Sequence, residues 1–379
     1  MKSLIEYIPE LIREGKSFAY MCKFKDGERK HGTEHLYTGE KIIRSQDSKI
    51  LDSLEKDTPV VISFPYAFKI FNMARESSYP PLMALIPENV MKNSLVREQD
   101  VKLRSHEYVF HDDAMERKIE LARERIRKGE ILQVVLSRKF GPLNIDPMER
   151  LESFLNYDRS MYVFYYRFNE FEIMGSSPEN TVTLDGRELM IEPIAGTRPV
   201  SSDPEENMRR EESLLNDEKE LLEHRMLVDL ARNDLGRISE YGTVKVTRSM
   251  EIRKFSSVMH IVSRVQSTLR DGVKKSQILD SVFPAGTVSG APKERATGII
   301  GEYEDDDRGP YAGAIGVAGK DSMDLALTIR CIYTMDGNYY TRAGAGIVKD
   351  SVPEKEVMEM FSKSLSAMGG VNNEVSSYQ

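Results

Sequence analysis

Two pairs of glutamates stand at a spacing that could hold a divalent cation. Glu220 and Glu223 form one Glu-x-x-Glu motif, and Glu356 and Glu359 form a second. Each motif lies in a stretch that reads as helix, where residues three apart share a face. Four carboxylates that met in a fold would repel one another, and Mg²⁺ resolves such repulsion. A single motif of this kind is far more often a solvated helix face, so the interpretation depends on the surrounding sequence.

Single polar residues beside apolar segments are the other candidates for chemistry. Glu179 follows Ser177-Pro178, and in a cleft with other carboxylates its pKa would rise and make it a general acid. His260 lies in an apolar strand, where a core role is commoner, but its ordinary pKa suits proton transfer. Arg330 closes an apolar strand and suits a substrate carboxylate, and Tyr311 lies in a predicted turn and can donate to an oxygen.

Three glycine-rich segments add a possible anion cradle. They are Ile194–Arg198, Ala285–Lys293 and Ala343–Gly346. None has the spacing of a phosphate-binding loop or of a dinucleotide fingerprint. Each alone is most often a turn. Together, with charged residues beside them, they indicate a pocket for a small carboxylate substrate.

Helical periodicity predicts the elements that carry the acidic pairs. Residues 214–235 read as one helix with a buried stripe of Leu214, Leu221 and Val228, joined by Leu215 and Leu222. The second acidic helix begins with a capping box, Ser351-x-x-Glu354, and carries apolar residues from Val357 to Met368 at helical spacing. A further helix starts at a capping box of Asp113 and Glu116 and ends at Gly129.

Strands are predicted at residues 60–64, 131–140, 161–167, 188–191 and 242–246. The alternation of strands and helices lacks a regular βαβ rhythm. An α+β architecture is therefore expected in place of a doubly wound sheet.

Composition excludes several functional classes. The chain has 379 residues and a formal net charge of −8, which disfavours binding to nucleic acid or to an anionic membrane. No apolar run approaches the ~18 residues of a membrane span, and Met1–Phe18 lacks the core of a signal peptide. The only cysteines, Cys22 and Cys331, are far apart, so neither disulfides nor a cysteine zinc site are expected. We expect a cytoplasmic enzyme or binding protein.

Taken in order, several long segments resemble the chorismate-utilising enzymes. The segments are 131–140 (ILQVVLSRKF), 175–179 (GSSPE), 193–199 (PIAGTRP), 217–237 (DEKELLEHRMLVDLARNDLGR), 258–262, 283–295 (FPAGTVSGAPKER), 308–313 and 343–359. This family includes anthranilate synthase component I, aminodeoxychorismate synthase component I, isochorismate synthase and salicylate synthase. The resemblance implies two packed antiparallel sheets with helices outside. It implies a catalytic chorismate-binding domain at 109–379, with residues 1–108 adding strands to the same unit and carrying a regulatory surface.

The resemblance also implies roles for individual residues. Glu223 and Glu359 match Mg²⁺ ligands, and Glu220 and Glu356 match carboxylates that act directly or through water. Glu179 matches the general acid that helps the C4 hydroxyl leave, and His260 matches a histidine associated with pyruvate elimination. Thr287 matches a pocket position and is grouped with these catalytic residues. Positions that match substrate contacts are Gly196, Thr197, Tyr311, Arg330, Gly344, Ala345 and Gly346.

Two positions discriminate between family reactions. Isochorismate-forming members carry a lysine base where this chain has Gln133, and many aminodeoxychorismate synthases carry a nucleophilic lysine where it has Ala195. Neither residue here can activate water or attack C2. Both differences favour direct attack by ammonia to give aminodeoxyisochorismate, followed by loss of pyruvate, which is the anthranilate synthase pattern of tryptophan biosynthesis. Neither cysteine lies in a glutaminase motif, so the resemblance implies a glutamine amidotransferase subunit that supplies ammonia.

Two alternatives remain open. Some aminodeoxychorismate synthases of the folate pathway lack the lysine, so Ala195 does not exclude that activity. A regulatory subunit that binds tryptophan or chorismate without turnover is disfavoured, because it would not need the proton-transfer groups. Tryptophan feedback is weakly supported: the segment 157–163 keeps only Ser160 and Tyr162 of the family motif, which places a regulatory site around Met161 and Tyr162.

Overall fold

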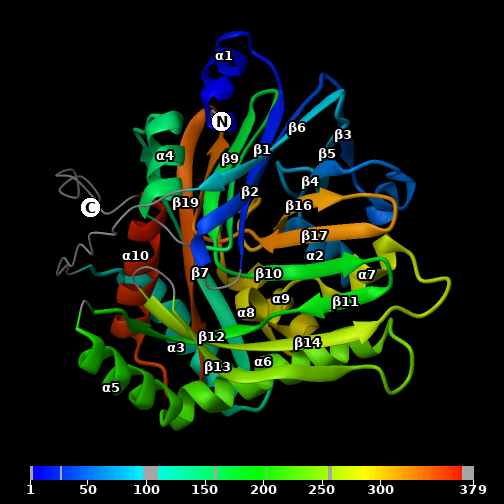
Figure 1. Cartoon of the computed structure of the whole chain (residues 1–379). Coiled ribbons are helices and arrows are strands. Elements are labelled where there is room, and N and C mark those ends of the chain that lie inside the picture. Colours follow the sequence, from blue (N-terminus) through cyan, green and yellow to red (C-terminus); the bar gives the residue numbers. More distant parts are fainter. Residues whose placement is uncertain are drawn as a thin grey trace.

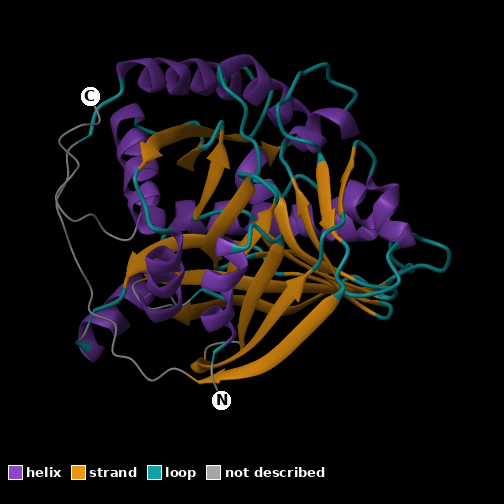
Figure 2. Ribbon diagram, turned by 90° about the horizontal axis from the view of Figure 1, so that it is seen from above, coloured by secondary structure: helices purple, strands orange, loops and turns teal. Residues whose placement is uncertain are grey.

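Two large antiparallel sheets packed face to face form the centre of the molecule (Figure 1). The computed structural model describes residues 3–25, 28–96, 110–157, 160–201, 203–254 and 258–368. Helices lie outside the sheets (Figure 2). The predicted α+β class, with two packed antiparallel sheets and outer helices, is confirmed.

The first sheet, here called sheet A, has nine strands in the described part of the chain. Their spatial order is β15 (Gly290–Ala291), β7 (Gln133–Leu143), β19 (Asn338–Ile347), β18 (Cys331–Met335), β9 (Phe171–Ser177), β8 (Tyr162–Phe168), β1 (Phe18–Lys25), β2 (Glu28–Thr38) and β6 (Asn89–Val96).

Sheet B has ten strands within the same described ranges. Their order is β12 (Ile194–Pro199), β14 (Val258–Thr268), β11 (Glu188–Ile191), β10 (Asn180–Asp185), β17 (Ser322–Leu327), β16 (Ala314–Ala318), β4 (Thr58–Ile62), β5 (Leu82–Leu85) and β3 (Ile42–Ser45), and β13 (Lys245–Lys254) pairs with β14 off this path. Strands from the first hundred residues therefore complete both sheets.

The helices cover the outer faces and edges of the sheets. They are α1 (Ile8–Arg13), α2 (Pro65–Ile70), α3 (Asp113–Arg127), α4 (Pro147–Tyr157), α5 (Pro204–Leu215), α6 (Glu218–Gly236), α7 (Lys275–Val282), α8 (Gly286–Ser289), α9 (Lys293–Tyr303) and α10 (Pro353–Met368), with 3-10 turns η1 (Leu4–Tyr7) and η2 (Ser48–Ser53). Helix α10 packs on β19 and on α3, and α6 packs on β12 and β14. None of the helices in the described ranges is long and apolar enough to cross a membrane.

Strand β8 shows how sheet A buries both of its faces. Tyr162, Phe164 and Tyr166 belong to the core between the sheets, whereas Val163 and Tyr165 pack in a second core beneath α1 and α4. Successive strand residues point to opposite faces, so this alternation assigns each side chain to one core. Burying a large apolar side chain stabilises the fold by roughly 1.5–3 kcal/mol, so both cores anchor the sheet.

Several predicted boundaries are wrong. The expected helix at 214–235 is two helices, α5 and α6, that meet at Asn216 and Asp217, because the Asp217 side chain caps α6 by accepting from the amide of Glu220. Leu222 is exposed, and the buried face of α6 instead carries His224, Leu227, Ala231, Asp234 and Leu235.

Smaller corrections concern caps and one strand. The N-cap of α3 is Asp112 and not Asp113, since the Asp112 carboxylate accepts from the amides of Ala114 and Met115. The strand expected at 242–246 is β13, which runs from Lys245 to Lys254. The other strands begin and end within three residues of the prediction.

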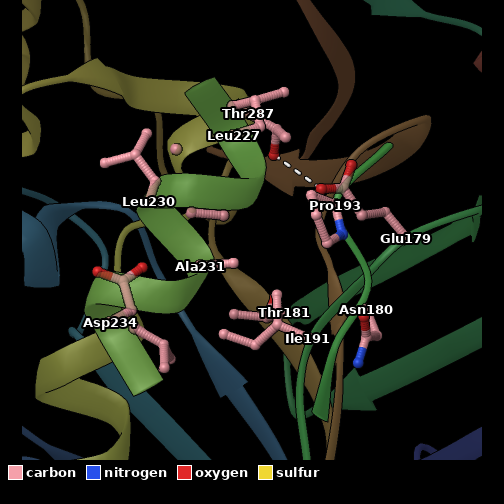
Figure 3. A pocket seen from close by; sticks show the side chains of 13 residues that line it. Glu179, Asn180, Thr181, Ile191, Pro193, Leu227, Leu230, Ala231, Asp234 and Thr287 are labelled. Carbon is pink, nitrogen blue, oxygen red and sulfur yellow. Dashed lines mark hydrogen bonds between the residues drawn. The ribbon is translucent and has the colours of Figure 1, made fainter. Parts of the chain in front are cut away.

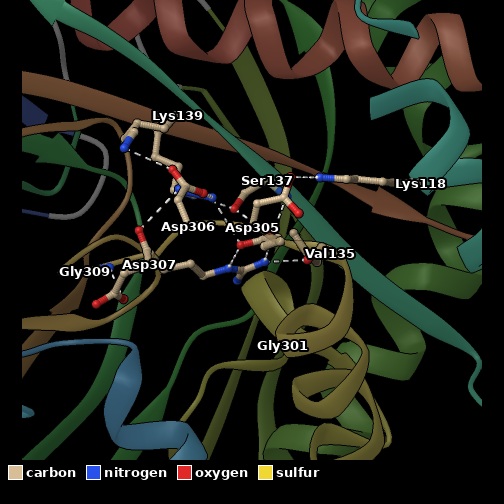
Figure 4. A network of polar contacts seen from close by, with 12 residues as sticks. Lys118, Val135, Ser137, Lys139, Gly301, Asp305, Asp306, Asp307 and Gly309 are labelled. Atoms are coloured by element: carbon tan, nitrogen blue, oxygen red, sulfur yellow. Dashed lines mark hydrogen bonds and ion pairs between the residues drawn. The ribbon is translucent and has the colours of Figure 1, made fainter. Parts of the chain in front are cut away.

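A buried ionic network fixes the strands that border the candidate site (Figure 4). The Glu304 carboxylate accepts hydrogen bonds from Arg308, Arg342, and both the amide and the hydroxyl of Ser137. Glu304, Arg308 and Arg342 are each at most 5% exposed. Every charge is paired, so the network ties β7, β19 and the loop that carries Tyr311 into one unit.

Candidate active site

The chain passes between the two sheets at two neighbouring crossovers, and each carries a predicted site residue. Glu179 lies between β9 of sheet A and β10 of sheet B, and Arg330 lies between β17 of sheet B and β18 of sheet A. The amide of Ser176 donates to the Arg330 carbonyl at 3.2 Å, and the amide of Leu327 donates to the Glu179 carbonyl at 2.9 Å. Arg330 has φ +50°, a conformation that costs energy for a non-glycine residue and recurs at functional sites.

A cavity of about 470 Å³ opens beside these crossovers, which is the size of a small-molecule site. It gathers most of the residues that the sequence singled out, from both sheets and from α6 and α10. Those that line it are Glu179, Ala195, Gly196, Thr197, Glu220, Glu223, His260, Thr287, Tyr311, Arg330, Gly344, Gly346, Glu356 and Glu359.

Glu179 is a buried acid that retains its proton near neutral pH. Its side chain accepts a hydrogen bond from the Thr287 hydroxyl at 2.9 Å, and the residue is 6% exposed. Burial raises the pKa of Glu179 to about 8, although the Thr287 hydrogen bond and the Arg330 charge oppose the rise. A carboxylic acid that is still protonated at pH 7 is suited to donate a proton to a leaving group.

His260 is held as a neutral ring that faces Arg330. Nδ1 lies 2.7 Å from the carbonyl oxygen of Gly196 and 3.1 Å from the Thr197 hydroxyl, and Nε2 lies 3.5 Å from Arg330 Nη2. Because a carbonyl only accepts, the hydrogen is assigned to Nδ1, and Nε2 is left to accept from Arg330. Burial, aided by the Arg330 charge, lowers the pKa of His260 to about 3. The pKa near neutrality that motivated the proton-transfer interpretation therefore does not apply here.

The two acidic pairs lie in the first two turns of α6 and α10 and face the same cavity. Burial, and next the Glu223 charge, raise the pKa of Glu220. Burial and the Glu359 charge likewise raise the pKa of Glu356, against a hydrogen bond with Ser351. Negative charge is stabilised near a helix N-terminus, but these pairs still repel within themselves, which leaves them suited to a cation.

The carboxylates match Mg²⁺ in ligand type. In the ranges that the structure describes, no group of three or more acidic, histidine or cysteine side chains is placed to hold a metal ion. Mg²⁺ usually takes one or two protein carboxylates and completes its shell with water and substrate oxygens. Gln133 orients one candidate ligand, because its Nε2 donates to Glu223 Oε1 at 2.8 Å.

Strand β19 forms the floor of the cavity with two glycines. A Cβ at Gly346 would lie 2.5 Å from Gln133 Nε2, and a Cβ at Gly344 would lie 2.9 Å from the Tyr311 hydroxyl. Larger residues would therefore displace side chains of the site. Ala345, also predicted to contact the substrate, is absent from the cavity wall because strand alternation turns it to the opposite face of β19, where it is fully buried in the hydrophobic core.

Comparison with known proteins agrees with this arrangement. Residues 75–369 match the family described as chorismate binding enzyme. The chain belongs to this family. The matched region contains the full set of cavity residues named above, and it begins before the predicted domain boundary at residue 109.

Relatives within the chorismate binding enzymes include anthranilate synthase component 1 of Aquifex aeolicus, 43% identical over 310 residues, which are 78% of this chain and 62% of the relative. The component 1 of Aeropyrum pernix is 50% identical over 249 residues, covering 64% of this chain and 56% of the relative. The chain thus spans about three fifths of the length of these curated relatives.

Solved structures show the same fold. Anthranilate synthase component I from Streptococcus pneumoniae superposes with a TM-score of 0.75 at 30% identity, covering 93% of this chain and 92% of that one. The menaquinone-specific isochorismate synthase of Escherichia coli gives a TM-score of 0.74 at 19% identity, covering 94% of this chain and 89% of that one, and this likeness concerns the fold alone.

Three cations that the sequence interpretation missed also line the cavity of this chorismate binding family member. They are Lys219, Arg342 and Lys363. Lys363 Nζ lies 2.6 Å from Glu359 Oε1 and donates to the Gly344 carbonyl at 3.2 Å. Its spacing of four residues from Glu359 on one helix was the signal available in the sequence.

The predicted tryptophan site lies away from the cavity. Met161 and Tyr162 are absent from the cavity wall, and the buried Tyr162 hydroxyl donates to Asp324 at 2.7 Å. Residues 158 and 159 of the same motif fall outside the described residues. The regulatory role of this segment stays a prediction.

Proposed function

We propose that this chain is the aminase component of an anthranilate synthase. It converts chorismate and ammonia to anthranilate and pyruvate in a magnesium-dependent reaction of tryptophan biosynthesis. The observation that carries the proposal is Glu179: a protonated, buried acid that shares one cavity with Arg330 and with two acidic pairs. The relatives named anthranilate synthase component 1 support the same assignment.

The cavity residues divide between holding the substrate and changing it. Arg330, oriented by neutral His260, offers a guanidinium fork to a carboxylate of chorismate. Tyr311 adds a hydroxyl beside Gly344. Glu223 and Glu359, with Glu220 and Glu356, would hold Mg²⁺, which when bound would offset the charge of the ring carboxylate.

Proton donation by Glu179 starts the reaction. Ammonia attacks C2 of the ring while Glu179 gives its proton to the departing C4 hydroxyl, which leaves as water. Burial keeps Glu179 protonated near neutral pH, so the proton is in place when ammonia is delivered to the cavity. Loss of the C2 proton and protonation of the enolpyruvyl methylene then release pyruvate, and the gain of aromaticity drives this second stage.

Gln133 and Ala195 favour ammonia over other nucleophiles. The Gln133 amide is engaged with Glu223 and offers no base to a water molecule. Ala195 lines the cavity and carries no amine. A residue that activated water or attacked C2 itself is thus missing at both positions where relatives of other specificity carry lysine.

We also propose a glutamine amidotransferase subunit as the source of ammonia. At pH 7 free ammonia is mostly ammonium, a poor nucleophile. A glutaminase of this kind needs an accessible cysteine nucleophile, but Cys22 and Cys331 are the only cysteines and both are fully buried. A partner chain that releases ammonia from glutamine would supply the nucleophile in its uncharged form.

Product identification tests the proposed function. The purified chain is incubated with chorismate, Mg²⁺ and an ammonium salt at mildly alkaline pH, and products are separated and followed by fluorescence. Anthranilate with one equivalent of pyruvate is the expected result. Aminodeoxychorismate without pyruvate would assign the folate-pathway activity instead. Absence of any turnover would indicate either that a partner chain is required or that the protein only binds.

The magnesium assignment has its own test. Glu223→Gln should abolish magnesium-dependent turnover and weaken Mn²⁺ binding measured by electron paramagnetic resonance, since a neutral amide is a poorer ligand than a carboxylate. Glu354→Gln, on the same helix as Glu359 but absent from the cavity wall, is the matched control. Unchanged Mn²⁺ affinity in Glu223→Gln would contradict the assignment.

A further inference from the structure

A second, smaller cavity borders Glu179 (Figure 3). Its volume is about 30 Å³. Glu179, Leu227 and Thr287 line both cavities and so form the wall between them. We call the smaller cavity the rear chamber. It is bordered by α6, by the start of β10, and by the segment that leads into α8, and it is partly open.

The polar groups of the rear chamber are not equally satisfied. Asn180 is fully engaged: its Oδ1 accepts from the Glu192 amide, and its Nδ2 donates to Thr183 and to the Met190 carbonyl. Thr181 is 3% exposed, and its hydroxyl has no hydrogen-bond partner among the described residues. A buried hydroxyl without a partner is unfavourable, and native structures usually satisfy it with an ordered water molecule.

Asp234 lines the far end of the rear chamber, and Lys293 holds it at 2.6 Å in a buried ion pair. Apolar side chains, among them Ala231 of α6 and Val282 of α7, complete the wall. A volume of about 30 Å³ accommodates one or two water molecules. Carboxyl and hydroxyl groups in the wall supply the two or more polar partners that a buried water needs.

We propose that the rear chamber holds one or two ordered water molecules, bound by Thr181 and Asp234, through which Glu179 regains its proton after each turnover. This inference rests on the proposed function, in which Glu179 gives its proton to the departing hydroxyl. The carboxylate left behind takes one proton from the adjacent water, and solvent reprotonates that water through the open side of the chamber. The ammonium nitrogen formed at C2 releases one proton to solvent, so the protons balance. Glu179 lines both cavities, so substrate in the larger one would leave the rear chamber as the route for a proton. Thr181 is a positioning residue, since it acts through the water.

Thr181→Val keeps the shape of the side chain and removes the hydroxyl. We expect kcat to fall about tenfold, a fraction of the ~10²–10⁴ that general acid catalysis contributes. KM for chorismate should stay unchanged, and Thr181→Ser should restore kcat. Thr297→Val is the matched control, because Thr297 is a buried threonine whose hydroxyl also has no partner in the described part of the chain, yet it lines neither cavity. An unchanged kcat in Thr181→Val would overturn the proposal.

Filling the chamber gives an independent test if Thr181→Val fails to fold. Ala231→Val adds two methyl groups at the chamber wall, so it should lower kcat without changing KM. If the chamber is only a packing void, Ala231→Val should leave kcat unchanged and raise the melting temperature.

Crystallography under xenon separates this inference from the proposed function. A dry apolar cavity binds xenon, whereas a hydrated one shows water density and excludes it. Water density in the wild-type chamber, absent in Thr181→Val, is expected whichever reaction the enzyme catalyses. Xenon in the wild-type chamber would overturn the proposal, while failure to form anthranilate would overturn only the proposed function.

Discussion

Two buried glutamates show opposite ionisation behaviour in this molecule. Glu179 and Glu304 are 6% and 5% exposed, and burial works to raise the pKa of each. For Glu179 the Thr287 hydroxyl and the Arg330 guanidinium do not offset the effect of burial, so the pKa rises to about 8. For Glu304 the charges of Arg308 and Arg342 outweigh burial and lower the pKa below its ordinary value.

The two glutamates differ in protonation state, and this difference matches their different roles in the molecule. Glu304 is a fixed anion, with its oxygens fully engaged by Arg308, Arg342 and Ser137, and it holds strands together. Glu179 keeps a proton and faces a cavity. Burial alone does not decide the protonation state of a carboxyl group; the charges and donors around it do.

The largest expected effect is on folding at Glu304. Glu304→Gln leaves two buried guanidinium groups without their main counter-charge, and loss of one partner of a buried pair costs about 3–5 kcal/mol. Chemical denaturation should show this loss in the free energy of unfolding. Asp305→Asn, next in sequence but with its carboxylate 86% exposed beside Lys118, should leave unfolding unchanged. Equal effects in both variants would show that the buried network has no special role.

At Glu179 the expected effect is on catalysis and not on folding. Glu179→Gln removes the proton donor at nearly constant shape, so kcat should fall by ~10²–10⁴. The free energy of unfolding should stay the same or increase at neutral pH, because a buried ionisable group is removed. Turnover assays and denaturation curves on one preparation check both outcomes. A variant that lost stability but kept its rate would reverse the roles assigned to the two glutamates.

The pH dependence of stability should differ in sign between the two sites. Folded Glu179 keeps its proton from its ordinary pKa of 4.5 up to about 8, a range where the unfolded chain has lost it. Wild-type stability therefore falls relative to Glu179→Gln as pH rises through this window, by about 1.4 kcal/mol per unit. For Glu304 the pKa is lowered, so its contribution is present above 4.5 and is lost as pH falls through the folded value. Unfolding measured at a series of pH values tests both; parallel profiles would contradict the contrast.

The smallest effect is expected at His260. Burial lowers the pKa of His260 to about 3, so its ring should show no titration between pH 5 and 9 in nuclear magnetic resonance. A midpoint near neutrality would restore the proton-transfer role and would place His260 beside Glu179 as a second titrating group of the cavity.

The sequence predicted the parts of the fold that local patterns encode. The apolar residues between Val357 and Ser364 predicted α10, because their helical spacing matches one buried face. The junction at Asn216 and Asp217 was missed, since the leucines on either side continue a helical spacing across it. The capping carboxylate of Asp217 was the signal that periodicity concealed.

Contacts distant in sequence were beyond such patterns. Glu304 binds Ser137 and Arg342, which are 167 and 38 residues away, and no local pattern around Glu304 indicates either partner. Within the site, the Glu-x-x-Glu spacing predicted a shared helix face, but only family resemblance indicated that the two faces meet. Ala345 was wrongly predicted to contact the substrate because the matching motif covers three consecutive residues. In a strand, alternate residues point to opposite faces, so only its two neighbours reach the cavity.

The crossovers that carry Glu179 and Arg330 have a consequence for synthesis of the protein. A chain emerges from the ribosome N-terminus first, and Glu179 emerges long before Thr287, 108 residues later. Helix α10, which supplies Glu356 and Glu359, is the last described element. Contacts of such separation form slowly, and until they form Glu179 is solvated and ionised like any surface glutamate. The raised pKa that keeps Glu179 protonated at neutral pH is thus acquired late in maturation. An incomplete nascent chain would therefore neither bind the substrate nor transfer a proton to it.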